Sequence, residues 1–120
     1  MATVRQRYPG RTLVLAIEPL TYHRTAALLE GLAQSCSAAD RVAVAEIFAV
    51  RDLDTTSVSA ADLAERIAAL GTPATAPGTV LETAAAILPS ITPETVVLVM
   101  GGGRSTELAV ALARGLTAAS

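Results

Sequence analysis

The chain has 120 residues, of which 52% are hydrophobic and 17% are charged, and its formal net charge is −2. This length and composition predict one compact, soluble domain over residues 1–120, and they exclude intrinsic disorder because the apolar content is ample for a core. Trp is absent and only 2% of the residues are aromatic. A base-stacking surface and a basic duplex-binding surface are both excluded on these grounds, so we expect no nucleic-acid partner.

The residue types that are missing limit the chemistry further. All nine basic residues are Arg, which excludes a phosphate-loop lysine and a Schiff-base lysine within this chain. One Cys and one His cannot form a metal site or an intrachain disulfide. The N-terminus has no apolar signal-peptide core, and no apolar run reaches the length of a membrane span. We therefore expect a cytoplasmic protein with no metal site and no membrane contact.

The first half of the chain alternates apolar strands with an amphipathic helix. Residues 1–8 are typical of the end of a helix, and Pro9-Gly10 is expected to stop this helix. A strand is predicted over residues 12–17, and it is apolar on both faces. Apolar residues then recur at helical spacing over residues 25–36, with Cys36 expected in the core. A second strand is predicted over residues 41–48.

The second half continues the same alternation. Ser59 and Asp62 predict a capping box at the start of a helix that ends at Gly71 and buries Leu63, Ile67 and Leu70. A short third strand is expected over residues 73–76. Thr79 is expected to cap a helix that runs to about Leu88, with Val80, Ala84, Ile87 and Leu88 on its buried face.

The clearest strand, residues 95–100, runs through a glycine turn into a last helix over residues 105–116. Four strand–helix cycles predict an α/β fold with a mostly parallel sheet flanked by helices.

The predicted loops bring polar residues to one edge of the sheet, because the carboxyl ends of parallel strands share an edge. The residues concerned are Tyr22, His23, Arg24, Arg51, Asp52, Gly101, Gly102, Gly103 and Arg104. The glycine run predicts either an anion site built from backbone N–H groups at a helix start or a tight turn that packs the helix on the sheet.

Three side chains at this edge also have a functional and a purely structural interpretation. Arg24 and Arg51 can each clamp a carboxylate or phosphate, or lie solvated on the surface. His23 can serve acid/base chemistry or be an exposed loop residue. The Glu18-Pro19 pair is interpreted as fixing the loop's exit from the sheet.

Several segments, read in order, resemble the UDP-N-acetylmuramate–L-alanine ligase family. The segment Glu18-Pro-Leu-Thr-Tyr-His-Arg-Thr25 is similar to the family's Phe-Gln-Pro-His-x-Tyr-Ser-Arg-Thr. The other similar segments are Arg5 to Arg11, Ala39-Asp-Arg-Val42, Glu46-Ile-Phe-Ala-Val-Arg-Asp52, Ser57-Val-Ser-Ala60 and Val97-Leu-Val-Met-Gly-Gly-Gly103. Together they cover nearly the whole chain in collinear order.

This resemblance implies the Rossmann-like, three-layer C-terminal domain of an ATP-dependent Mur ligase of peptidoglycan precursor synthesis. In such ligases this domain binds the incoming amino acid, while ATP and Mg are held mostly by a central domain that this chain does not resemble. By the same resemblance Arg24 matches the family's arginine that holds the amino acid's carboxylate. As our own hypothesis, Tyr22 and Arg51 also bind the substrate, and Gly101 to Gly103 form an anion or nucleotide rim. The implied partners are the amino acid, a UDP-muramoyl nucleotide and the N-terminal and central ligase domains.

Departures from the family pattern set the remaining expectations. Leu20 and Thr21 stand where the family motif has His and often a basic residue, and Arg104 stands where an acidic residue usually follows the last glycine. The Asp-Asp-Tyr-x-His-His-Pro segment is absent, so we expect the chain to lack the start of the family domain. Alone it is expected to have no catalytic residue, no turnover and no tightly bound cofactor. The alternative is a stand-alone, non-catalytic module that binds a small molecule or nucleotide, or a structural, self-associating domain.

Overall fold

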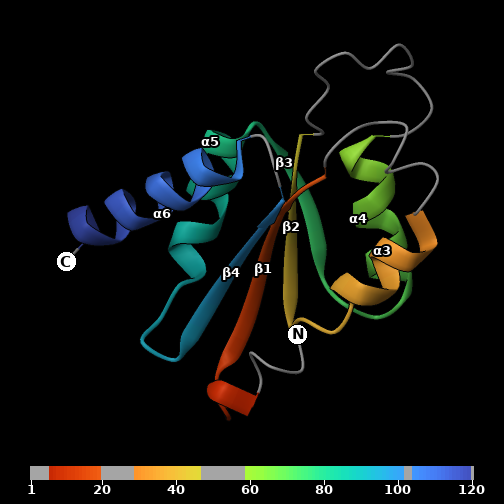
Figure 1. Cartoon of the computed structure of the whole chain (residues 1–120), viewed down its shortest axis with the longest axis horizontal. Helices are drawn as coiled ribbons and strands as arrows, with labels where there is room; N and C mark the ends of the chain where they lie inside the picture. The colour runs from red at the N-terminus through yellow and green to blue at the C-terminus, as the bar shows by residue number, and fades with distance from the viewer. Residues whose placement is uncertain (1–5, 20–28, 47–58, 102–103, 120) are drawn as a thin grey trace.

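The computed structural model describes residues 6–19, 29–46, 59–101 and 104–119 (Figure 1). In chain order the elements are β1 (Thr12–Glu18), α3 (Leu29–Cys36), β2 (Arg41–Ala45), α4 (Ala60–Ala69), β3 (Ala74–Gly78), α5 (Val80–Ile87), the 3₁₀ turn η1 (Leu88–Ser90), β4 (Thr95–Gly101) and α6 (Ser105–Ala119). The four strands form one sheet in the order β3-β2-β1-β4, and every neighbouring pair is parallel.

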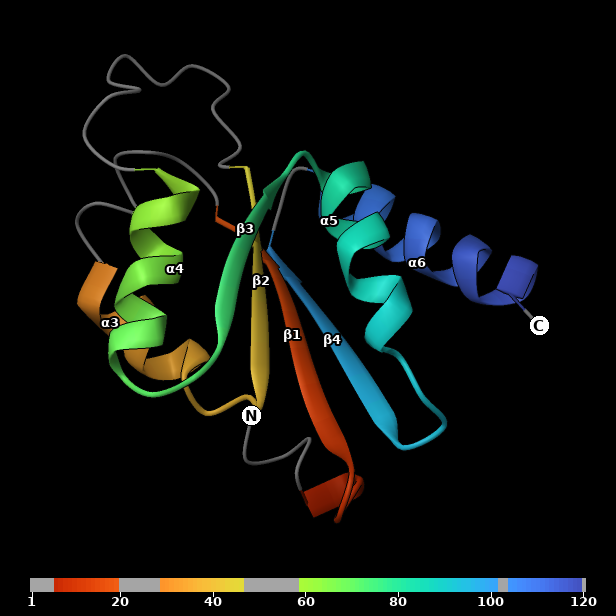
Figure 2. The ribbon, with the colours of Figure 1, turned by 180° about the vertical axis from the view of Figure 1, so that it is seen from behind.

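Helices cover both faces of this sheet, as Figures 1 and 2 show from opposite sides. Leu13, Leu15 and Ile17 of β1 belong to a buried cluster shared with α3 and α4. Val14 and Ala16 of the same strand belong to a second cluster shared with α5 and α6. Alternate residues of β1 thus fill two cores, which explains why this strand has no polar face. The prediction of a three-layer α/β domain is confirmed.

Two helices begin at the predicted caps. The Ser59 hydroxyl accepts a hydrogen bond from the Asp62 N–H at 3.2 Å, and the Asp62 carboxylate accepts one from the Ser59 N–H at 2.8 Å. Thr79 and Glu82 make the same reciprocal pair at 3.2 and 3.1 Å. Each box satisfies two N–H groups that a helix start leaves without intrahelical partners. Cys36 is buried as expected.

Several predicted boundaries were wrong. Leu70 was expected in the core but is 48% exposed, whereas the predicted helix stop at Gly71 is confirmed, since this glycine has φ +98° directly after the C-cap. The second strand ends at Ala45, after a register shift against β3 between Ala43 and Ala45. Strand β3 starts one residue later than expected and runs two residues farther.

Two helix ends also differ from their predicted positions. Leu88 opens η1 rather than closing α5, and α6 continues three residues past 116. Residues 1–5, 25–28 and 47–48 of the predicted elements lie outside the described residues. Within the described part of the chain, no helix combines the length and apolar character that crossing a membrane requires.

Candidate functional site

The carboxyl ends of β1 and β4 lie at the point where the order of the strands reverses. From β1 the chain moves outward through β2 to β3, whereas the next strand, β4, returns to the other side of β1. The helices that connect β1 to β3 lie on one face, and α5 and α6 lie on the other (Figures 1 and 2). Open α/β sheets bind ligands at such a reversal of strand order, outside the carboxyl ends of the strands.

Glu18, the last residue of β1, lies at this position and is 1% exposed. Its Oε1 accepts a hydrogen bond from the backbone N–H of Arg104 at 2.7 Å. Arg104 immediately precedes the 15 residues of α6, so the carboxylate lies at the positive end of this helix. A carboxylate is favoured there by the unpaired N–H groups and by the helix dipole.

The second carboxylate oxygen of Glu18 has no such partner. Oε2 is buried, and none of the described residues donates a hydrogen bond to it. Burial raises the pKa of Glu18, the Arg104 N–H and guanidinium partly offset that rise, and Glu107 adds to it. A buried carboxylate oxygen without a donor destabilises the folded protein, and such groups concentrate at functional sites.

Gly101 brings the backbone of β4 close to Glu18. The two residues are register partners at the ends of their strands. Gly101 has φ +137°, a backbone conformation that side chains disfavour, and a Cβ at this position would overlap the carbonyl oxygen of Glu18. The glycine is therefore required both by the turn into α6 and by the close approach of the two strand ends.

The sequence-predicted site residues are only partly described. Tyr22, His23, Arg24, Arg51, Asp52, Gly102 and Gly103 lie outside the described residues, so their predicted roles stay predictions. Gly101 lies at the predicted edge, and the Arg104 side chain is exposed there, 4.0 Å from the Glu107 carboxylate.

Sequence reasoning missed Glu18 as a site residue, because the Glu18-Pro19 pair was interpreted only as the exit from the strand. The available signal was an acidic residue that directly follows six residues of an apolar strand.

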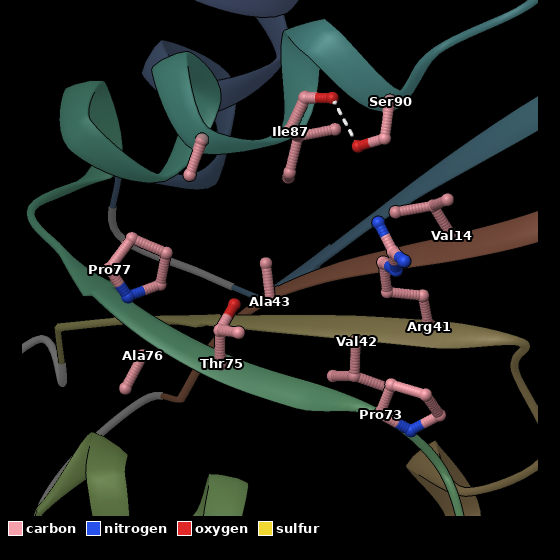
Figure 3. Close-up of a pocket in the computed structure, with 11 residues that line it drawn as sticks. Val14, Arg41, Val42, Ala43, Pro73, Thr75, Ala76, Pro77, Ile87 and Ser90 are labelled. Carbon is pink, nitrogen blue, oxygen red and sulfur yellow. Dashed lines mark hydrogen bonds between the residues drawn. The ribbon is translucent and has the colours of Figure 1, made fainter.

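A second hollow of about 510 Å³ lies away from this edge, over β2 and β3 and beside α5 (Figure 3). Its lining is mostly Ala, Val and Pro, with the Arg41 side chain turned toward it and the Ser90 hydroxyl donating to the Ile87 carbonyl at 2.9 Å. These polar groups contain no nucleophile–base pair. Among the described residues there is also no group of three or more His, Cys, Asp or Glu side chains that could hold a metal ion.

The described residues at the carboxyl edge do not fit the phosphates of a nucleotide. The Arg104 N–H that would face an anion already donates to Glu18, and the ionised carboxylate would repel a phosphate beside it. The exposed Arg104 guanidinium is the cation near this position, and it already lies beside Glu107. Neither the Arg104 N–H nor its guanidinium is therefore free for the phosphates of ATP.

The structure is a Rossmann-like α/β domain in which the order of the parallel strands reverses between β1 and β4. The chain is 33% identical over 109 residues to the UDP-N-acetylmuramate–L-alanine ligase of Chloroflexus aggregans, which covers 91% of this chain and 23% of that relative. It is 46% identical over 63 residues to the ligase of the same name from Pediococcus pentosaceus, covering 52% of this chain and 14% of the relative. No family model matches the chain.

By sequence, the chain is similar to a part of these UDP-N-acetylmuramate–L-alanine ligases. It is also 42% identical over 64 residues to the UDP-N-acetylmuramate–L-alanine ligase of Lachnospira eligens, where the match covers 53% of this chain and 14% of the relative. The chain thus spans about 14% to 23% of the length of the curated relatives it matches.

Proposed function

We propose that this chain is the C-terminal, substrate-binding domain of an ATP-dependent Mur-type ligase. The complete enzyme would join an amino acid to a UDP-N-acetylmuramate-linked carboxylate in the synthesis of peptidoglycan precursors. The observation that carries the proposal is the similarity to UDP-N-acetylmuramate–L-alanine ligases along 91% of the chain. The reversal of strand order between β1 and β4 supports it, because parallel α/β sheets bind small ligands outside the carboxyl ends of the strands at such a point.

The proposed task of this domain is to bind and orient the incoming amino acid. Arg24 would hold the carboxylate of the amino acid, since a planar guanidinium can donate two parallel hydrogen bonds to it. Tyr22 and Arg51 would complete this subsite, and Gly101 to Gly103 would shape the adjacent rim. Orientation of the amine toward an activated carboxyl group accelerates amide formation because it removes the entropic cost of bringing the two groups together.

ATP and Mg would be held by other domains of the complete ligase. When bound there, ATP supplies the phosphoryl group that activates the muramoyl carboxylate. This chain contains no Lys, so it lacks the side chain on which a phosphate loop depends. Closure of the domains would then exclude water from the site, and this step needs the partner domains as well as this one.

The proposal is tested by amide-bond formation in the complete gene product. An antibody against this 12.2 kDa chain first gives the size of the native protein in a lysate of the source cell, and we expect a band several times larger. In that enzyme Arg24→Ala should raise the KM for the amino acid about tenfold or more, the loss expected for a charge-assisted hydrogen bond. An unchanged KM removes the assignment of Arg24, and a native band of 12.2 kDa removes the ligase proposal.

A further inference from the structure

The N-terminus of α6 is neutralised by the chain's own carboxylate. Helix starts attract anions because their first N–H groups lack partners and because the helix dipole is positive there. Here the Oε1 atom of Glu18 already accepts the Arg104 N–H at 2.7 Å, 86 residues away in sequence. A free anion would therefore compete with the Glu18 carboxylate for the Arg104 N–H, and the negative charge of Glu18 would repel it.

The remaining polar atom at this position requires a donor. Oε2 of Glu18 is buried without a partner among the described residues, and the residue as a whole is 1% exposed. A carboxylate oxygen can only accept hydrogen bonds, so the group that complements it must carry N–H or O–H. A positively charged donor is favoured over a neutral one because it also compensates the buried negative charge.

Among the described residues, the Arg104 guanidinium is near enough to lower the pKa of Glu18 but donates no hydrogen bond to Oε2. The Arg104 side chain is about half exposed and its Nε lies 4.0 Å from the Glu107 carboxylate. The described elements that meet at this point are the ends of β1 and β4, at Glu18 and Gly101, and the start of α6, which Arg104 precedes. Gly101 has no side chain, so it contributes no donor to Oε2 beyond its backbone.

We propose that Glu18 and the start of α6 form a binding site for a primary ammonium group at the carboxyl ends of β1 and β4. The ammonium group donates a hydrogen bond to Oε2 while Oε1 stays bound to the Arg104 N–H. This inference rests on the proposed function, because it identifies the ammonium end of the amino acid as the group that Glu18 recognises. The start of α6 would therefore help to bind a cation through Glu18, whereas the glycine run predicted that it binds an anion.

The test is a titration of the whole 120-residue chain, followed through the backbone amide signals of Gly101 and Arg104 in ¹H–¹⁵N NMR spectra. The three probes are L-alaninamide in its ammonium form, neutral N-acetyl-L-alaninamide and inorganic phosphate. We expect L-alaninamide to shift both amide signals, and the neutral analogue and phosphate to bind at least about tenfold more weakly. Equal binding of the neutral analogue, or a phosphate response stronger than that of L-alaninamide, overturns the proposal.

The matched variants are Glu18→Gln and Glu107→Gln. Glu18→Gln keeps an oxygen that can accept the Arg104 N–H but removes the charge, and we expect it to weaken L-alaninamide binding at least about tenfold. Glu107 lies one turn into α6 with a 62% exposed side chain, so Glu107→Gln should change the same affinity less than about twofold. Equal effects of the two variants overturn the proposal.

Failure of this inference is distinguishable from failure of the proposed function. N-acetyl-L-alanine, which carries the carboxylate and no ammonium, reports on the proposed carboxylate subsite independently of Glu18. If it binds and L-alaninamide does not, the ammonium assignment falls while the ligase proposal stands. Comparison of the charged and neutral probes on the unsubstituted chain also keeps the test valid if Glu18→Gln fails to fold.

Discussion

The two edges of the sheet satisfy their polar groups in different ways. At the amino edge, the Asp40 carboxylate accepts the Leu13 N–H at 2.7 Å, and the Thr92 and Thr95 hydroxyls lie 3.1 Å apart in one hydrogen-bonded turn. At the carboxyl edge, Glu18 is more deeply buried and one of its oxygens has no partner among the described residues. The Asp40 carboxylate has a protein partner and stabilises the fold. The buried Glu18 oxygen has none among the described residues, and such an unsatisfied group is what a bound ligand could complement.

The same contrast holds for the positive-φ glycines at the two edges. Gly10 precedes β1 with φ +76° and open space around the position of a Cβ. Gly101 ends β4 with φ +137°, and a Cβ there would overlap the Glu18 carbonyl. The amino edge therefore needs glycine for backbone conformation alone, and the carboxyl edge needs it for conformation and for close approach.

The largest expected effect comes from substitution of Gly101. Gly101→Ala combines a disfavoured φ with overlap against rigid backbone, and we expect it to lower the free energy of unfolding by about 3 kcal/mol or more. Gly10→Ala has only the backbone cost and should lose about 1 kcal/mol. Urea denaturation of both variants measures the difference, and equal losses would contradict the close approach at the carboxyl edge.

Asp40→Ala tests whether the amino edge is purely structural. It leaves the Leu13 N–H without its acceptor at a partly buried position, so we expect a loss of about 1–3 kcal/mol in the free energy of unfolding. Binding of L-alaninamide should stay unchanged, because Asp40 lies at the opposite end of the sheet from Glu18. A loss of affinity comparable to that of Glu18→Gln would show that the two edges are not functionally distinct.

Glu18→Gln should have a smaller effect on stability, with a defined dependence on pH. Burial raises the pKa of Glu18 above its ordinary 4.5, so the folded state binds this proton more tightly than the unfolded state does. The resulting stabilisation is fully present below the unfolded pKa and is lost as the pH rises through the folded pKa.

Gln does not titrate, so the stability of the variant relative to the natural chain should increase from acid to neutral pH. Thermal unfolding of both proteins across this range is the measurement. A difference that is constant with pH, or that changes in the opposite direction, would contradict the burial of an incompletely compensated carboxylate at the carboxyl edge.

The smallest effect is expected at the surface of the amino edge. The Arg11 guanidinium donates to the Pro93 carbonyl and lies 3.9 Å from the Glu94 carboxylate, with both side chains substantially exposed. Exposed ion pairs contribute little because water and salt screen them. Arg11→Ala should therefore cost less than about 1 kcal/mol in urea denaturation, and a larger loss would make this turn a main determinant of stability.

Most of the fold could be predicted from local signals in the sequence. Apolar runs identified the strands, and the Ser59–Asp62 and Thr79 signals placed two helix starts at the residues that the structure shows. The errors lie where tertiary contacts decide. Strand β2 ends at Ala45, and its register against β3 shifts between Ala43 and Ala45. No local pattern encodes that irregularity.

The site was less accessible to sequence reasoning. The carboxyl edge and Gly101 follow from parallel topology, but the bond between Glu18 and the Arg104 N–H joins residues 86 positions apart. Strand order had to be known before the end of β1 could be placed beside the start of α6. The burial that leaves Oε2 without a partner is likewise a property of the packed chain.

The central claim is that ligands bind at the carboxyl edge between β1 and β4, and a titration of the chain with L-alanine tests it most directly. Backbone amide signals in ¹H–¹⁵N spectra report on both edges in one experiment. We predict that the signals of Gly101 and Arg104 shift in a saturable way, while those of Asp40, Thr92 and Thr95 stay in place. Shifts confined to the amino edge, or absent from both edges at saturating L-alanine, would contradict the account.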